Sequence, residues 1–462
     1  MRKKTTPDRP KSGRRVGKEF KALAWTARHP GSFLAPGTLA VSGLELGWTA
    51  TGGIVGGTAA GLCVWYRAHP NTFDHYAAPR MRAWRRRWSV YFGPKFHKAL
   101  RACDLYVIDR KTGEERFSRV VRVRSYSPSV DTVTLALAAG QGRRAFEDKL
   151  ETLADTLKVE RIAMERVKPG YIALIIERSE PFTEPIPAPD MPDESAAVDP
   201  DDIYIGETEY GTEWRQGIRG KHIFIAGATG AGKNSIVMAI LRGLAPLVRD
   251  GLARLWICDP KQLEFAKLEE IAHAYGDTEE RCAEVIEAYV EDLRATQQRC
   301  AAAGVRKLPL SRENPMNILV LDEIGAILAY GDAVIARTVR KHLAIITSQG
   351  RVTDHSALAL VQEPTKDTVP VRELFPVRIC MRVTAQAHVD MVLGEGARLR
   401  GALADEIPDS PDTAGIGYVV RKRSRTPQRV RAAYTDDHDI DAMVAFIHRG
   451  PATDGPTLAA VA

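Results

Sequence analysis

The chain has 462 residues, of which 44% are hydrophobic and 27% charged, and its formal net charge is +7. That length allows two or three domains, and the composition is that of a globular protein. The six cysteines are scattered without a C-x-x-C pair, which argues against a disulfide framework and a zinc site and fits a reducing cytosol. The positive charge points modestly to nucleic acid or an anionic membrane surface.

The N-terminal segment combines basic ends with a long uncharged stretch. Residues 1–30 are rich in Arg and Lys, lack a cleavable signal peptide and are expected to form a basic cytoplasmic tail. Residues 31–66 contain Glu45 as their only charge, and about twenty uncharged residues can span a bilayer as a helix. Because basic flanks stay in the cytoplasm, we expect a transmembrane hairpin with arms Gly31–Leu44 and Leu46–Tyr66. The alternative is a buried glycine-rich hairpin in a soluble protein.

Residues 67–100 form a basic and aromatic juxtamembrane segment. Arg85, Arg86 and Arg87 stand between Trp84 and Trp88. We interpret this cluster as an interfacial anchor whose contacts are anionic lipid or DNA.

Residues 101–178 have the pattern of a small α+β domain. Apolar runs and a Lys-Pro-Gly turn predict two strands, a helix and two more strands: Val120–Tyr126, Thr132–Leu137, Arg143–Leu157 as the helix, Arg161–Val167 and Tyr171–Glu177. This segment shows no catalytic cluster, so we interpret it as a structural or oligomerisation module. Residues 179–202 are rich in proline and acidic residues and are expected to form an extended linker.

A glycine-rich turn at residues 227–233 has the pattern G-x-x-x-x-G-K of a phosphate-binding loop. Ile223–Ile225 predicts a buried strand before it, and Ile236–Leu241 predicts a helix after it. Glycines let successive N–H groups converge on phosphate oxygens, the helix N-terminus adds positive partial charge, and Lys233 can reach the β- and γ-phosphates. The expected ATP-binding residues are Gly227, Ala228, Thr229, Gly230, Ala231, Gly232, Lys233, Asn234 and Ser235.

Candidate Mg²⁺ ligands come from this loop and from a second strand. Asn234 stands where Ser or Thr usually ligates Mg²⁺; either its amide oxygen or the hydroxyl of Ser235 can take that place, and the sequence does not choose between them. Asn317–Leu321 predicts a buried strand that delivers Asp322 beside the loop, where its carboxylate can hold Mg²⁺. Glu323 is then placed to polarise the attacking water as general base.

Other polar residues follow further predicted strands. Asp259-Pro-Lys261 follows the predicted strand Leu255–Cys258, and Arg382 follows Val377–Met381. Gln362 follows Ala357–Val361 and is a candidate sensor of the γ-phosphate. Strands that alternate with helices imply a RecA-like α/β domain with a parallel sheet at residues 203–449, followed by a flexible tail at 450–462.

These motifs occur in one order: the loop at 227–233, Asp259-Pro-Lys-Gln-Leu-Glu264, Leu321-Asp-Glu323, Gln362 and Gly394–Gly401. Over about residues 203–435 the chain resembles the FtsK/SpoIIIE family of double-stranded DNA translocases. Its short length, its membrane-like hairpin and its Gly-Lys-Asn-Ser loop ending look most like the branch that serves conjugative transfer in Gram-positive plasmids and integrative elements.

The resemblance implies an ATP-hydrolysing hexamer at the cell membrane, with the motor in the cytoplasm, duplex DNA in its pore and other transfer proteins as partners. It assigns phosphate binding to Lys233, magnesium to Asp322, water activation to Glu323 and the sensor role to Gln362. A neighbouring subunit's arginine would stabilise the transferred charge, and the candidates are Arg382 and Arg378. A basic segment, Arg421–Arg425, is a candidate for DNA phosphate contacts.

Three other functions stay open on the sequence alone. A chromosome-partitioning translocase at the division septum would share the same motor. A secretion-type ATPase acting on protein substrates would not need DNA. A non-hydrolysing scaffold has Asn234 as its only support, and the intact Lys233, Asp322 and Glu323 argue against it.

Overall fold

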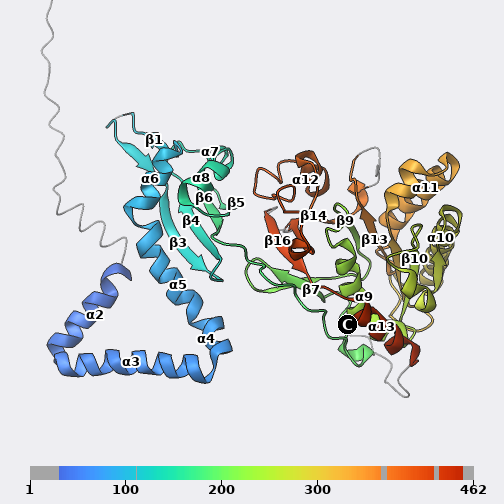
Figure 1. The fold of residues 1–462 in the computed structure, drawn as a ribbon, viewed down its shortest axis with the longest axis horizontal. Coiled ribbons are helices and arrows are strands. Elements are labelled where there is room, and N and C mark those ends of the chain that lie inside the picture. The colour runs from blue at the N-terminus through green and yellow to red at the C-terminus, as the bar shows by residue number, and fades with distance from the viewer. Residues whose placement is uncertain (1–30, 111, 366–371, 421–425, 451–462) are drawn as a thin grey trace, which may run out of the picture. The chain divides into compact units, whose positions relative to one another are not determined.

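The computed structural model describes residues 31–110, 112–365, 372–420 and 426–450 (Figure 1). The expected tail at 1–30, residues 451–462 of the expected C-terminal tail and the basic segment at 421–425 lie outside these residues. The chain divides into two compact units, Met1–Ala78 and Pro79–Ala462.

The described part of the first unit is helical. Helices α2 (Gly31–Glu45) and α3 (Trp48–Ala68) occupy the two arms of the expected hairpin, and α4 (Pro70–Tyr76) follows. Among the described residues, however, no helix combines the length and the apolar character that a membrane crossing requires. The reason lies in α3, where Gly, Thr and Ala make up much of the uncharged run. The transmembrane part of the expectation is therefore not shown.

The second unit begins with helices and a four-stranded antiparallel sheet of order β3-β4-β6-β5. Alternate strand residues such as Val123, Val133 and Leu174 pack against helices to form one apolar core. The expected single helix is broken into two at Asp148–Lys149. The elements are α5 (Ala78–Arg86), a π-helical turn (Arg87–Tyr91), α6 (Pro94–Ala102), β1 (Tyr106–Ile108), β2 (Glu115–Phe117), β3 (Arg119–Ser125), β4 (Val130–Ala136), α7 (Arg144–Glu147), α8 (Leu150–Leu157), β5 (Arg161–Lys168) and β6 (Tyr171–Glu177).

The expected linker packs against the segment that follows it. It holds one short 3₁₀ turn (Ser195–Ala197), and the side chains of Phe182 and Ile186 are buried. Arg431 donates hydrogen bonds to the carbonyls of Phe182 and Glu184. These contacts hold an irregular segment in place through its backbone carbonyls. Composition alone does not predict such contacts.

A ten-stranded sheet of order β11-β10-β12-β13-β9-β14-β15-β16-β7-β8 dominates the rest of this unit. The strands from β11 to β14 are parallel, whereas β15, β16, β7 and β8 extend the sheet antiparallel. The sheet is thus mostly parallel rather than wholly so, because two hairpins complete it. Its strands are β7 (Ile203–Thr208), β8 (Glu213–Gln216), β9 (His222–Ala226), β10 (Ala253–Cys258), β11 (Ala274–Gly276), β12 (Met316–Leu321), β13 (His355–Val361), β14 (Val377–Met381), β15 (Ile416–Val420) and β16 (Pro427–Ala432).

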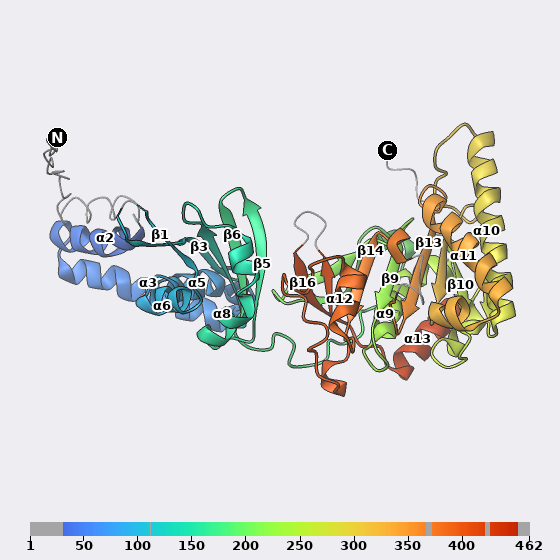
Figure 2. The same cartoon turned by 90° about the horizontal axis from the view of Figure 1, so that it is seen from above.

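Helices cover both faces of this sheet (Figure 2). Phe224 and Ala226 of β9 join the core under α10 (Glu279–Ala302), α11 (Ala333–Gln349) and α12 (Gln386–Leu393), whereas Ile223 and Ile225 join the core under α9 (Lys233–Arg249) and α13 (Asp437–His448). Since neither face meets water, the central strands are continuous apolar runs. This explains why they were recognisable from the sequence.

His222, the first residue of β9, makes stability depend on pH. Its side chain is buried, and its ring nitrogens find no hydrogen-bond partner within the described structure. Burial, with a smaller contribution from the charge of His355, lowers the pKa of His222 from 6.5 to about 4. Between these two values the unfolded chain binds the proton and the folded chain does not, so stability falls as the pH falls.

We expect this group to remove about 2 kcal/mol of stability between about pH 7 and about pH 5, at 1.36 kcal/mol per pKa unit. Urea unfolding at the two pH values measures the loss, and His222→Leu should reduce it. The control His448→Gln changes an exposed histidine and should leave the pH dependence as it is. An equal loss in the wild type and in His222→Leu would contradict the assignment.

Candidate functional site

Four parallel strands end at one edge of the ten-stranded sheet, and each is followed by a residue singled out in the sequence. The glycine-rich loop follows β9, Asp322 follows β12, Gln362 follows β13 and Arg382 follows β14. The order β12-β13-β9-β14 places these residues on neighbouring strands. In open α/β sheets, ligands bind at the carboxyl ends of the strands.

The loop is held by both strands that flank β9. The N–H of Gly227 donates to the carbonyl of Val361 at 3.0 Å, and the N–H of Ala228 donates to the carbonyl of Arg382 at 2.7 Å. Helix α9 then begins at Lys233. The loop backbone is therefore preorganised in front of a helix N-terminus, which is the arrangement that binds phosphate groups.

Gly232 is the position in this loop that tolerates a side chain least. Its φ is +88°, in the left-handed region, and a Cβ atom would lie 2.4 Å from the backbone nitrogen of Gly415. Both the conformation and the close approach therefore require glycine.

We expect Gly232→Ala to lower ATP affinity at least tenfold and to lower the melting temperature, because either the loop or the 414–415 segment must shift. Titration with a fluorescent ATP analogue and a thermal melt measure the two effects. Gly304→Ala is the matched control, since Gly304 has a φ of +66° but nothing within 4 Å of its Cβ position. The control should cost only about 1 kcal/mol and retain ATP affinity; equal effects of the two substitutions would contradict the close-approach argument.

The Lys233 side chain is folded back onto its own loop. Its Nζ donates to the carbonyl of Gly227 at 2.8 Å and to that of Ala228 at 3.2 Å, and the residue is 9% exposed. Burial lowers the pKa of its amine. The ammonium group thus lies beneath the loop, where phosphate oxygens can replace the two carbonyls as its partners.

Acidic side chains lie beside the loop in excess. Asp322 is 5% exposed, and burial followed by the charge of Asp259 raises its pKa from 3.8 to about 6. Asp259 is fully buried, and among the described residues nothing hydrogen-bonds its Oδ1. A buried excess of negative charge fits a divalent cation, and Asp322 with the oxygens of Asn234 or Ser235 is the donor set that Mg²⁺ prefers.

Glu323 is held in a strained position between two partners. Its φ is +44° although it is not glycine, and such strain clusters at functional sites. Its Oε1 accepts the backbone N–H of Gln362 at 3.3 Å, and its Oε2 lies 3.4 Å from Nζ of Lys261. Sequence reasoning placed Lys261 in a family motif but missed this ion pair with the candidate base.

Gln362 also contacts the glycine-rich loop. Its side-chain Oε1 accepts the hydroxyl of Thr229 at 3.2 Å. Hydrogen bonds therefore run from Thr229 through Gln362 to Glu323. This chain links the loop to the candidate base, which suits the sensor role expected of Gln362.

Arg382 lies against the loop of its own chain. Its Nη2 donates to the carbonyl of Thr229 at 2.7 Å and pairs with Asp409 at 2.7 Å, and the residue is 9% exposed. The sequence had made Arg382 a candidate for the neighbouring subunit's site, whereas this geometry favours the same chain's site. Arg378 lies next to Phe224 in the sheet register, before the loop begins.

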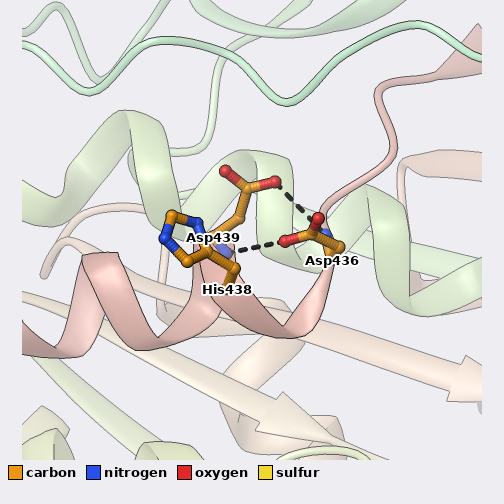
Figure 3. Close-up of side chains that lie close together, drawn as sticks. All are labelled: Asp436, His438 and Asp439. Carbon is orange, nitrogen blue, oxygen red and sulfur yellow. Dashed lines mark hydrogen bonds between the residues drawn. The ribbon is translucent and has the colours of Figure 1, made fainter.

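A second group of potential metal ligands lies at the start of α13. The ligand atoms of Asp436, His438 and Asp439 are within 4.8 Å of one another. Two hydrogen bonds link Asp436 and Asp439 (Figure 3): the backbone N–H of Asp439 donates to the carboxylate of Asp436 at 2.8 Å, and the backbone N–H of Asp436 donates to that of Asp439 at 3.3 Å. This reciprocal pair is a capping box, so the helix end accounts for the cluster.

Comparison with known proteins agrees with this geometry. Residues 200–388 match the FtsK/SpoIIIE family. A DNA translocase FtsK of Corynebacterium glutamicum is 21% identical over 364 residues, which cover 72% of this chain and 38% of that protein. The DNA translocase SftA of Bacillus subtilis is 23% identical over 243 residues, covering 49% of this chain and 24% of that protein. The chain thus spans less than two fifths of these relatives.

A solved structure shares the fold. The conjugation coupling protein TcpA of pCW3, in its monomer form with ATPγS, is 17% identical with a TM-score of 0.50, over 76% of this chain and 98% of that one. Together with the phosphate loop and the acidic residues beside it, the family match identifies this part of the molecule: the chain carries an FtsK/SpoIIIE family domain at residues 200–388, and that domain is a P-loop ATPase.

Proposed function

We propose that this chain is an ATP-driven translocase of double-stranded DNA that serves conjugative transfer of a plasmid or integrative element. The observation that carries the proposal is the meeting of Lys233, Asp322 and Glu323 at one sheet edge within an FtsK/SpoIIIE family domain. The curated relatives are named DNA translocases. The conjugative setting is supported by the Gly-Lys-Asn-Ser loop ending, and it is compatible with the TcpA fold likeness.

The side chains suggest how hydrolysis proceeds. The ammonium group of Lys233 gives up its hydrogen bonds to the two loop carbonyls and binds β- and γ-phosphate oxygens instead. Arg382 contacts the same loop, so its guanidinium group can bind phosphate oxygens there as well. Asp322, with Asn234 or Ser235, would hold Mg²⁺, which when bound neutralises phosphate charge. Glu323 accepts a proton from the attacking water once its Oε2 leaves Lys261.

Coupling to DNA follows from the contacts of Gln362. This residue contacts both the loop and Glu323, so loss of the γ-phosphate would change the contacts at the end of β13. We propose that such movements, in a hexameric ring, pass the duplex along by its phosphates rather than by its bases.

The deciding experiment measures ATP hydrolysis by the full chain with and without linear duplex DNA, alongside Lys233→Ala. Stimulation by duplex that disappears in Lys233→Ala supports the proposal. Hydrolysis that ignores DNA favours a secretion-type ATPase acting on protein. Absent hydrolysis with ATP still bound favours a scaffold and points to Asn234. A partitioning translocase would give the first result too, and separating it requires a DNA-transfer assay between cells.

We further propose that the N-terminal unit attaches the chain to a membrane. Leu44, Leu46 and Trp48, at the turn between α2 and α3, are 80%, 60% and 68% exposed, and large exposed apolar side chains suit the bilayer interface. Flotation of the full chain with phosphatidylglycerol vesicles tests this. Leu46→Asp combined with Trp48→Asp should abolish flotation, and an unchanged result would contradict it.

A further inference from the structure

The four-stranded sheet has one face that its own helices leave uncovered. Val120, Val123 and Ser125 of β3 are buried, so the residues between them project to the opposite side. A β-bulge after Val120 keeps three exposed arginines on that opposite side despite their uneven spacing: Arg119, Arg122 and Arg124. We call these three residues, with Thr132 and Thr134 of β4, the arginine face.

Small residues flank the three arginines across the sheet. Arg119 stands beside Ala136, Arg122 beside Thr134 and Arg124 beside Thr132 in the register of β3 and β4. The next strand adds Ala173 beside Thr134. The cross-strand neighbours of the arginines are therefore small, whereas Val121 of β3 and Tyr126 add larger side chains that are 37% and 39% exposed; a broad ligand can still approach the guanidinium groups over the small residues.

The positive charge of the arginine face is largely uncompensated. Within the described part of the chain, neither Arg119 nor Arg122 forms an ion pair or a side-chain hydrogen bond, and Arg124 donates to the hydroxyl of Tyr126 at 2.9 Å. Glu165 of the same face lies on β5, three strands from Arg122, which is about 14 Å at 4.8 Å per strand. Three like charges on one strand without acidic partners indicate an anionic ligand.

We propose that the arginine face binds the phosphate backbone of duplex DNA, as a contact outside the ATPase site; this rests in part on the proposed function. Residues on one strand rise about 3.3 Å each, so the three guanidinium groups form a row of about 15 Å. Duplex DNA carries one charge per about 1.7 Å of its axis, and such a row can meet several phosphates. Arginine and threonine are typical donors to phosphate oxygens.

The chemistry of the face favours a nucleic acid over a lipid surface. Peripheral membrane binding combines basic residues with large apolar side chains that enter the bilayer. Next to these arginines the face presents mainly threonine and alanine, and its larger apolar side chains, Val121 and Tyr126, are only 37% and 39% exposed. Threonine hydroxyls reinforce contacts to a backbone but add nothing to insertion.

The test measures duplex binding by the full chain without ATP, by fluorescence anisotropy across a salt series. In the triple variant Arg119→Gln, Arg122→Gln and Arg124→Gln, the slope of log affinity against log salt should fall by about 2.7, since each lost phosphate contact removes about 0.9. Affinity at about 0.1 M salt should fall tenfold or more. The corresponding triple change to Lys keeps the charges and should keep the slope.

A matched control removes three charges from the helical side of the same sheet. Arg143→Gln, Arg144→Gln and Lys158→Gln change exposed residues around α7 and α8 and should leave the slope unchanged. An equal fall in this control would show that only net charge matters and would overturn the proposal. So would an unchanged slope in the arginine-face glutamine variant.

Three further outcomes separate this inference from a membrane-binding role and from the proposed function. If the glutamine variant loses binding to phosphatidylglycerol vesicles but keeps duplex affinity, the face is a membrane surface and the proposal is wrong. If duplex binding depends on the face but duplex does not stimulate ATP hydrolysis, the inference stands and the proposed function fails. If duplex stimulates hydrolysis but the salt slope is unchanged in the glutamine variant, the proposed function stands and the inference fails.

Discussion

Replacement of Glu323 by Gln is expected to lower the rate constant for ATP hydrolysis by about 10²–10⁴-fold, the range that a positioned general base contributes. An amide of the same shape can still accept the N–H of Gln362 but cannot take a proton from water. ATP affinity should stay within a few-fold of the wild type, because Glu323 does not belong to the phosphate loop. Steady-state hydrolysis and titration with a fluorescent ATP analogue give the two quantities separately.

Two other variants serve as a comparison and a control for Glu323→Gln. Lys233→Ala should lose ATP affinity as well as hydrolysis, because its ammonium group lies under the loop that receives the phosphates. Glu313→Gln is the matched control, since Glu313 is an exposed glutamate on a surface loop, and it should change neither quantity. Hydrolysis by Glu323→Gln within about threefold of the wild type, where at least a hundredfold loss is expected, would show that another group activates the water.

The sequence predicts where the residues of the candidate site lie in the sheet, because their positions follow local rules. The loop needs glycines at fixed spacing, and parallel strands buried on both faces must be apolar runs, so Asp322, Gln362 and Arg382 could each be located at a strand end. Parallel pairing then brings these ends to one edge. For this part, periodicity and motif spacing suffice.

Long-range pairing is what the sequence could not supply. The sequences of β15, β16, β7 and β8 do not indicate that these strands extend the ATPase sheet in antiparallel order. The Lys261–Glu323 ion pair and the seat of Arg382 on Thr229 are contacts between distant residues. A sequence shows which side chains are basic but not which groups they contact. For the same reason, the arginine face could be recognised only once the register of β3 and β4 was known.

One such long-range contact is a buried cluster of charges between the two sheets of the second unit. Arg161 of β5 pairs with Glu177 of β6 and with Glu209 beyond β7, and it donates to the carbonyl of Gly401 at 2.6 Å. Arg429 of β16 pairs with Glu177 at 3.1 Å. Arg161, Glu177 and Glu209 are 4%, 0% and 1% exposed, so these ions have no water to replace a lost partner.

The pKa of Glu177 reflects how strongly this cluster stabilises its ionised carboxylate. Burial alone would raise its pKa, but the charge of Arg161 and hydrogen bonds outweigh burial and lower it from 4.5 to about 2. A carboxyl whose folded-state pKa is lowered stabilises the protein above its unfolded value. That contribution is lost as the pH falls from about 4.5 towards about 2.

Removal of one partner from this cluster should destabilise the protein strongly, because it leaves buried charges without their counter-ion. In Arg161→Met, the buried carboxylates of Glu177 and Glu209 both lose Arg161 as a partner, so we expect a loss of about 3–5 kcal/mol, measured by urea unfolding. The control Arg215→Met breaks an exposed pair with Glu213 and should cost about 1 kcal/mol or less. Because Met fills the site without charge, the variant should also lose less stability than the wild type on acidification below about pH 4.5. Equal costs for the two substitutions would mean that water reaches the cluster, and the two sheets would then be held by their apolar contacts instead.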